Sequence, residues 1–186
     1  MRQALEPILK INNLQTHFFT KAGILKAVDG VSFEIAAGEI VGLVGESGSG
    51  KSITGFSVMG LVDPPGKIID GSINFKGKDL SALSNDQMQN IRGNRIAMIF
   101  QDPMMTLNPV LRIETQMIEA IQAHDGSISR EDARIRSRDT LGLVGISSPD
   151  ERLRAYPHQF SGGMRQRVSI AIAMLNRPDL IIADEP

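Results

Sequence analysis

The chain has 186 residues, enough for one sizeable core, and its 41% hydrophobic and 22% charged residues are close to globular averages, so neither disorder nor a fibrous repeat is indicated. Its 20 Lys and Arg against 21 Asp and Glu leave a formal net charge of -1, which gives no long-range attraction for DNA or RNA and argues against a dedicated nucleic-acid binder. The chain contains no cysteine, which excludes disulfides, thiolate metal sites and cysteine nucleophiles within it.

The N-terminal sequence, MRQALEPILK, does not resemble a signal peptide, because Glu6 and Pro7 stand where an apolar stretch is needed. No run approaches the roughly 20 apolar residues of a membrane-spanning helix. We therefore expect a chain that stays in the cytoplasm.

The first predicted elements are strands. From Ile8 to Ile35 the pattern is strand-like, and in VSFEI, residues 31–35, the apolar side chains share one face while Ser32 and Glu34 share the other. This period of two predicts a small antiparallel sheet.

The next segment predicts a buried strand followed by a helix. The unbroken apolar run IVGLV, residues 40–44, lies between two glycines and is typical of a strand buried on both faces of a parallel sheet. After Ser52 the apolar spacing becomes helical, and Pro64-Pro65-Gly66 ends that stretch.

The segment GSINFKGKDL, residues 71–80, again alternates apolar and polar residues, which predicts another strand and a turn, with Ile73 and Phe75 pointing inward. Ser84, followed by Asn and Asp, predicts the cap of a short helix. RIAMIF, residues 95–100, is a second candidate for a buried strand.

The middle of the chain is predicted to be helical. One helical face is shared by Met117, Ile118 and Ile121. Ser129 opens a sequence that resembles a capping box, before a helix reaching toward Gly145. We expect residues 104–158 to form a helical subdomain inserted into a domain that covers residues 1–186. One more helix is predicted over 161–176, and LIIAD, residues 180–184, predicts a third buried strand.

The segment GESGSGKS, residues 45–52, matches the phosphate-binding P-loop between a predicted strand and a predicted helix. Its glycines let backbone N–H groups point at the β-phosphate, while Lys51 reaches the β- and γ-phosphates and Ser52 ligates Mg²⁺. The alternative is a glycine-rich turn that matches by chance, and the strand–helix context favours the phosphate loop. The nucleotide contacts expected here are Gly45, Glu46, Ser47, Gly48, Ser49, Gly50, Lys51 and Ser52.

An acid pair follows the last predicted strand, at the edge where open α/β sheets build their sites. We expect Asp184 to hold Mg²⁺ through water and Glu185 to polarise the attacking water. Two acids that merely solvate a strand end are the alternative, and a P-loop in the same chain favours the functional interpretation.

Ser161-Gly162-Gly163 opens the last predicted helix and offers a hydroxyl, N–H groups and the positive end of a helix dipole to an anion. An ordinary helix cap explains the same residues.

Taken together, GESGSGKS, the Gln101 of IFQDP, FSGGMRQR and LIIADEP resemble the ATP-binding subunit of an ABC transporter, in the expected order and over nearly the whole chain. The segments ESGSGKS, IFQDPMMTLNP and YPHQFSGGMRQRV are similar to those of subunits that energise bacterial dipeptide and oligopeptide importers.

The resemblance implies an α/β fold: a P-loop NTPase of ABC type with a mixed central sheet, an N-terminal antiparallel β subdomain and an inserted helical subdomain. Further C-terminal strands are expected in this family and are missing here, so we expect an N-terminal fragment that ends just after the Walker B motif. Such a fragment is expected to have little or no ATPase activity alone.

The resemblance also assigns roles to single residues. Gln101 would contact Mg²⁺ or the attacking water, and Ile53 and Thr54 would adjoin the nucleotide. Phe18 would stack on adenine, with the adjacent Phe19 as an alternative and plain core packing as the other explanation for either ring. The residues expected to face ATP held by an opposing subunit are Ser161, Gly162, Gly163 and Met164. Phe160 and Met164 replace the Leu and Gln of the commonest signature, a variant that the peptide-importer branch often shows.

The implied activity is ATP hydrolysis that powers peptide import, with ATP and Mg²⁺ as cofactors, at the cytoplasmic face of the bacterial inner membrane. The implied partners are a second ABC ATPase subunit, identical or not, two transmembrane permease subunits docking on residues 104–158, and indirectly an extracytoplasmic peptide-binding protein; no nucleic acid is expected. Two alternatives remain: a soluble ABC ATPase acting on nucleic acid or ribosomes, and a truncated ATP-binding module without catalysis.

Overall fold

A computed structural model describes residues 7–186, so the first six residues, which enter the signal-peptide argument, lie outside the described part. The chain divides into two compact units, residues 1–89 and 90–186. No helix in the described part combines the length and the apolar character needed to cross a bilayer.

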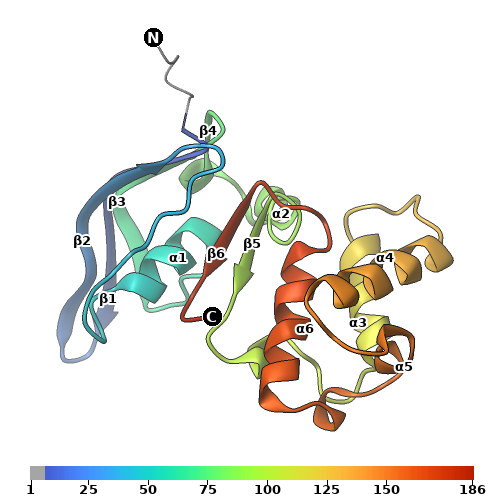
Figure 1. Cartoon of the computed structure of the whole chain (residues 1–186). Coiled ribbons are helices and arrows are strands. Elements are labelled where there is room, and N and C mark those ends of the chain that lie inside the picture. The colour runs from blue at the N-terminus through green and yellow to red at the C-terminus, as the bar shows by residue number, and fades with distance from the viewer. Residues whose placement is uncertain (1–6) are drawn as a thin grey trace. The chain divides into compact units, whose positions relative to one another are not determined.

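A four-stranded antiparallel sheet, in the order β2-β1-β3-β4, forms the first unit (Figure 1). Its strands are β1 (Leu9–Thr20), β2 (Gly23–Ile35), β3 (Gly66–Phe75) and β4 (Lys78–Asp79). Ile73 and Phe75 are only 1% and 5% exposed, which confirms that this alternation turns them inward. The predicted small antiparallel sheet is therefore confirmed.

Helix α1 (Lys51–Met59) contacts β1 and β2, and Figure 1 shows it lying across the sheet. It ends at Gly60, whose φ of 60° closes the helix before the predicted proline stop. The short elements η1 (Leu80–Ala82) and α2 (Asn85–Gln89) complete the unit. Ser84 caps α2 as predicted, since its Oγ accepts from the Gln87 backbone N–H at 3.3 Å and its own N–H donates to Gln87 Oε1 at 2.9 Å.

Residues 40–44 do not form a strand, so that prediction is wrong. Ile40 and Val44 are 99% and 89% exposed, and none of the described strands pairs with this run. An apolar run becomes a buried strand only where neighbouring strands complete its backbone hydrogen bonds and other elements cover its faces. Without such neighbours the apolar sequence alone does not make this run a strand.

The second unit contains a two-stranded parallel sheet of β5 (Ile96–Ile99) and β6 (Leu180–Ala183), paired from Ile96↔Leu180 to Ile99↔Ala183. All of β5 is buried, as predicted. The strand predicted at residues 180–184 is present as β6, but the prediction that it is buried is wrong, because Ile181 is 42% exposed. The physical reason is the cover of the sheet: Ile170 and Ala173 of α6 pack on Ala97 and Ile99 of β5, the neighbouring strand.

Helices make up the rest of this unit. They are η2 (Pro103–Met105), α3 (Ile113–Gln122), α4 (Arg130–Leu143), α5 (Pro149–Leu153), η3 (Pro157–Gln159) and α6 (Gly162–Met174). The predicted apolar face of α3 is confirmed, since Met117, Ile118 and Ile121 are at most 1% exposed. Ser129 accepts from the Asp132 N–H at 3.0 Å, which confirms the predicted cap of α4.

Two apolar clusters hold the second unit together. The larger joins α3, α4, α5 and α6 around Met117, Leu141, Leu153 and Val168. The smaller packs Ile170 and Ala173 of α6 against Ala97 and Ile99 of β5. Helix α6 is therefore the element through which the helical core meets the parallel sheet.

Candidate functional site

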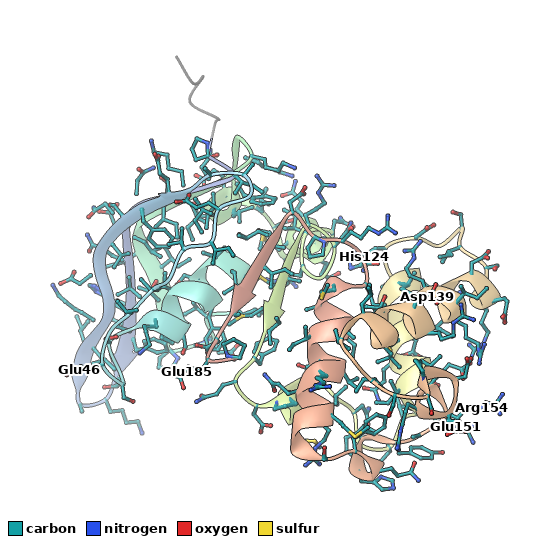
Figure 2. The ribbon with its side chains drawn as sticks, viewed as in Figure 1. Glu46, His124, Asp139, Glu151, Arg154 and Glu185 are labelled. Atoms are coloured by element: carbon teal, nitrogen blue, oxygen red, sulfur yellow. The ribbon has the colours of Figure 1, made fainter. Side chains whose placement is uncertain are left out.

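The loop that precedes α1 has the backbone geometry of a phosphate cradle. Gly48 and Gly50 have φ values of 80° and 89°, in the region that favours glycine. Gly50 is the N-cap of α1, and its carbonyl accepts from the Thr54 N–H at 2.8 Å. Gly45, the first residue of the loop, lies close to Ser49: a Cβ at Gly45 would be only 2.5 Å from Ser49 Oγ. Glu46, labelled in Figure 2, belongs to the same exposed loop.

Lys51, the first residue of α1, folds its side chain back over this loop. Its Nζ donates to the carbonyl oxygens of Gly45 and Glu46, both at 2.9 Å. An ammonium has three donors and no acceptor, so these two contacts place its positive charge at the loop. Phosphate oxygens are stronger acceptors than neutral carbonyls and would compete for those donors.

The start of α1 is suited to an anion for a second reason. Its N-cap is a glycine, which has no side chain to offer to the N–H groups of the first turn, where Lys51, Ser52 and Ile53 lie. The positive end of the helix dipole adds to the field of Lys51. Ser52 supplies a hydroxyl oxygen, the donor type that Mg²⁺ prefers. The predicted P-loop helix is therefore present, whereas the strand predicted before it is not.

We predict that Gly50→Ala destabilises the protein more than Gly48→Ala does. Both positions need a positive φ, which costs about 1–2 kcal/mol for alanine. Only at Gly50 would the added Cβ collide with the carbonyl oxygen of Ala27 on β2, whereas at Gly48 it meets open space. Overpacking of that kind adds about 1–3 kcal/mol.

Urea denaturation of the two variants measures this difference. Gly48→Ala is the matched control, because it isolates the backbone term. Equal losses of unfolding free energy in the two variants would show that Gly50 is not in close contact with Ala27 of β2.

The second group of candidate residues gathers at the carboxyl ends of β5 and β6. Gln101 follows β5, and Asp184 and Glu185 follow β6, which Figure 2 shows with Glu185 just beyond its end. The Asp184 N–H donates to the Ile99 carbonyl at 2.9 Å and so continues the parallel pairing. Gln101 Nε2 donates to Glu185 Oε2 at 2.7 Å.

This contact joins residues 84 positions apart in the sequence. Glu185 also has a φ of 46°, uncommon for a residue with a side chain. The structure thus brings together the two residues expected to handle the attacking water, Gln101 and Glu185, and places Asp184 beside them.

Phe18 lies on β1 opposite Gly66 of β3. The ring packs on that glycine, because a Cβ at Gly66 would lie 2.7 Å from Phe18 Cε1. Phe18 is half-buried, whereas Phe19 is 45% exposed on the other face of the strand. The role of either ring toward adenine stays a prediction.

The signature residues begin α6. Ser161 is its N-cap, with Oγ accepting from the Met164 N–H at 3.3 Å, so the helix-cap explanation holds in this structure. Gly162 and Gly163 are exposed, and a Cβ at either would meet no atom within 4 Å. Their role toward an opposing subunit stays a prediction.

Two supporting residues were missed by the sequence analysis. Gly66 was interpreted only as the end of a proline stop, and its fit against Phe18 depends on the β1–β3 register. Arg152 was not considered, although its guanidinium lies 5.7 Å from the centroid of the Phe160 ring, next to the signature. No motif surrounds either residue, so only the three-dimensional pairing reveals them.

Comparison with known proteins agrees with this geometry. The chain is 51% identical over 183 residues to the dipeptide transport ATP-binding protein DppD of Bacillus subtilis, covering 98% of this chain and 54% of DppD. It is 46% identical to DppD of Escherichia coli, covering 96% of this chain and 54% of that protein. The chain thus spans about half the length of these curated relatives.

The fold matches a solved cassette. The dimeric structure of the ATP-binding cassette MJ0796, in a post-hydrolysis state bound to ADP and Pi, superimposes with a TM-score of 0.84 at 29% identity, covering 95% of this chain and 73% of MJ0796. The profile of the ABC transporter family matches residues 28–186. Because that profile covers most of the sequence, including the P-loop, the signature and the acid pair, the chain belongs to the ABC transporter family.

Proposed function

We propose that the chain is the ATP-binding and ATP-hydrolysing part of a subunit that powers the import of peptides across a bacterial membrane. The observation that carries the proposal is the phosphate cradle, formed by Gly48, Gly50 and Lys51 at the N-terminus of α1. The names of the most similar relatives, which are dipeptide and oligopeptide transport ATP-binding proteins, support the substrate class.

The proposed chemistry is in-line attack of water on the γ-phosphate, with positioning and charge lowering the barrier. Residues 45–54 hold the triphosphate, and Glu185 orients and polarises the water. Mg²⁺, when bound, neutralises charge on the phosphates; the oxygen donors proposed for it are Ser52, Gln101 and Asp184. The hydrogen bond between Gln101 and Glu185 supports a shared task at one reacting centre.

The proposed partners follow from the same family. Ser161, Gly162, Gly163 and Met164 face nucleotide held by a second ATPase subunit, and two permease subunits dock on residues 104–158. An extracytoplasmic peptide-binding protein delivers the cargo to the permeases. With these partners, the proposed location of the subunit is the cytoplasmic face of the inner membrane, as a peripheral protein. The exposure of Ser161, Gly162 and Gly163 at the start of α6 supports the first contact, because an opposing subunit could reach these residues.

Peptide uptake tests this proposal. In a bacterial strain that lacks the corresponding subunit, the whole subunit carrying this sequence should restore accumulation of a radiolabelled dipeptide. The Lys51→Ala version should restore none, because the triphosphate would lose its principal cation. Lys21→Ala, which changes an exposed lysine in the β1–β2 turn, is the matched control and should behave as wild type.

Restored uptake of a sugar such as maltose, with no peptide uptake, would contradict the substrate class. Co-purification of RNA together with absent uptake would favour the nucleic-acid alternative. Peptide uptake that survives Lys51→Ala would contradict the ATP-driven mechanism.

A further inference from the structure

Two buried hydroxyl groups connect α1 to the sheet of the first unit. Thr16 of β1 is 0% exposed and Ser57 of α1 is 2% exposed. Their oxygens, Thr16 Oγ1 and Ser57 Oγ, lie 2.8 Å apart. A buried hydroxyl group that lacks a hydrogen-bond partner destabilises the folded state, so each of these two groups depends on the other.

The direction of the hydrogen bond can be assigned. Ser57 Oγ donates to the Ile53 carbonyl at 2.7 Å, and a serine hydroxyl has a single hydrogen to donate. Thr16 is therefore the donor toward Ser57. The result is a chain of two hydrogen bonds from the strand, through Ser57, to Ile53 in the first turn of the P-loop helix.

Thr16 shares a strand face with Phe18. The two residues pair with Ile68 and Gly66 of β3 in unbroken register, and residues two apart on a strand point to the same face. Because Thr16 meets α1, that face is the one on which α1 lies. The Phe18 ring stands on it one step further along β1, against Gly66.

The N-terminal end of α1 is held separately. Gly50 fits so closely against Ala27 of β2 that only a glycine is accommodated there. The helix is thus fixed at two points, by Gly50 on β2 and by Ser57 on β1. These two points set the offset between the phosphate loop and the strand that carries Phe18.

The stability of the fold does not by itself require hydroxyl groups at positions 16 and 57. One such hydrogen bond contributes only modestly to the net free energy of unfolding, and an apolar pair of the same shape can be equally stable. What a hydrogen bond adds is a fixed distance and direction, which matters when a ligand is held at both ends.

We propose that Thr16 and Ser57 are positioning residues that hold the Phe18 ring at a set distance from the phosphate loop, so that a purine base and its triphosphate are bound together. The inference rests on the proposed function and deepens it, because it assigns a role in base recognition to residues outside the nucleotide-binding motifs.

The test compares two probes, Mg-ATP and Mg-tripolyphosphate, by titration calorimetry on the chain. Thr16→Val removes the hydroxyl, keeps the shape and leaves Ser57 bonded to Ile53. It should weaken ATP binding about three- to tenfold, the equivalent of one hydrogen bond, and change tripolyphosphate binding less than about twofold. Thr16→Ser, which keeps the hydroxyl group, should bind ATP with wild-type affinity. A loss that is equal for the two probes would overturn the proposal, because it would indicate a general disturbance of the loop.

Further variants make the outcome decisive. Phe18→Ala should weaken ATP binding selectively, and adding Thr16→Val to it should cause no further loss; a further loss, or no effect of Phe18→Ala, would overturn the proposal. Should Thr16→Val lower the melting temperature too far for binding studies, Ser57→Ala removes the acceptor instead and should show the same selectivity. Retained tripolyphosphate binding in Lys51→Ala would instead refute the proposed function, so the two failures are distinguishable.

Discussion

Replacing Lys51 with alanine is expected to lower the affinity for Mg-ATP by at least about 100-fold. The Lys51 ammonium already lies over the loop, with two donors engaged by the Gly45 and Glu46 carbonyls. In the proposed complex with ATP those donors would turn to the β- and γ-phosphates, and each hydrogen bond to a charged group contributes about 1.5–3 kcal/mol. Two such contacts account for a loss of about 3–6 kcal/mol.

Calorimetric titration with Mg-ATP measures this loss. The fold should tolerate the change, because alanine is the best helix former and the position is the first of α1. Circular dichroism should therefore show wild-type helix content. The matched control is Lys67→Ala, which removes an exposed lysine from β3 in the same unit. Affinity that falls less than about fivefold would mean that the loop binds its ligand without this cation, and would remove Lys51 from the site.

The elements that the sequence predicts correctly depend on local signals. The caps at Ser84 and Ser129 involve residues three positions apart, and the structure shows both. The inward positions Ile73 and Phe75 follow from a period of two within one strand. Each of these signals is complete within one helical turn or one strand, so no distant contact is needed to interpret it.

The wrong predictions concern strands whose environment is decided elsewhere. The apolar run at 40–44 and the strand at 180–184 were both predicted to be buried strands. The hydrophobicity of a segment indicates that burial would stabilise it. Whether the segment is buried depends on elements distant in the sequence that pair with it or cover it. Ile40 is 99% exposed because its run pairs with none of the described strands. Ile181 is 42% exposed, on the strand beside the one on which α6 packs.

In the candidate site, too, features that depend on consecutive residues were predicted and features that depend on distant contacts were not. The P-loop was predictable, because its glycines, its lysine and its helix are consecutive. Gln101 and Glu185 were each predicted, but their mutual hydrogen bond was not, since it depends on the parallel register that aligns Ile99 with Ala183. The fit of Phe18 against Gly66 likewise requires the β1–β3 register.

Replacing Glu185 with glutamine is expected to reduce ATP turnover by at least about 100-fold while ATP affinity changes less than about threefold. The change removes the carboxylate proposed to accept a proton from the attacking water, and general-base catalysis of that kind contributes about 10²–10⁴ to the rate. Binding should be retained, because the residues proposed to hold the triphosphate are 45–54 and are unchanged. The shape of the side chain is kept, and its amide oxygen still accepts from Gln101 Nε2.

Phosphate release by the whole subunit, with ATP affinity measured in parallel, separates chemistry from binding. Glu151→Gln is the matched control: it makes the same change at an exposed carboxylate on α5, labelled in Figure 2, and should leave the rate unchanged. Single-turnover measurements should place the loss in the hydrolysis step, because the site still binds ATP but no group withdraws the proton. Wild-type phosphate release in Glu185→Gln would remove this carboxylate from the mechanism and leave its contact with Gln101 as a structural one. A parallel loss of ATP affinity would assign Glu185 to binding.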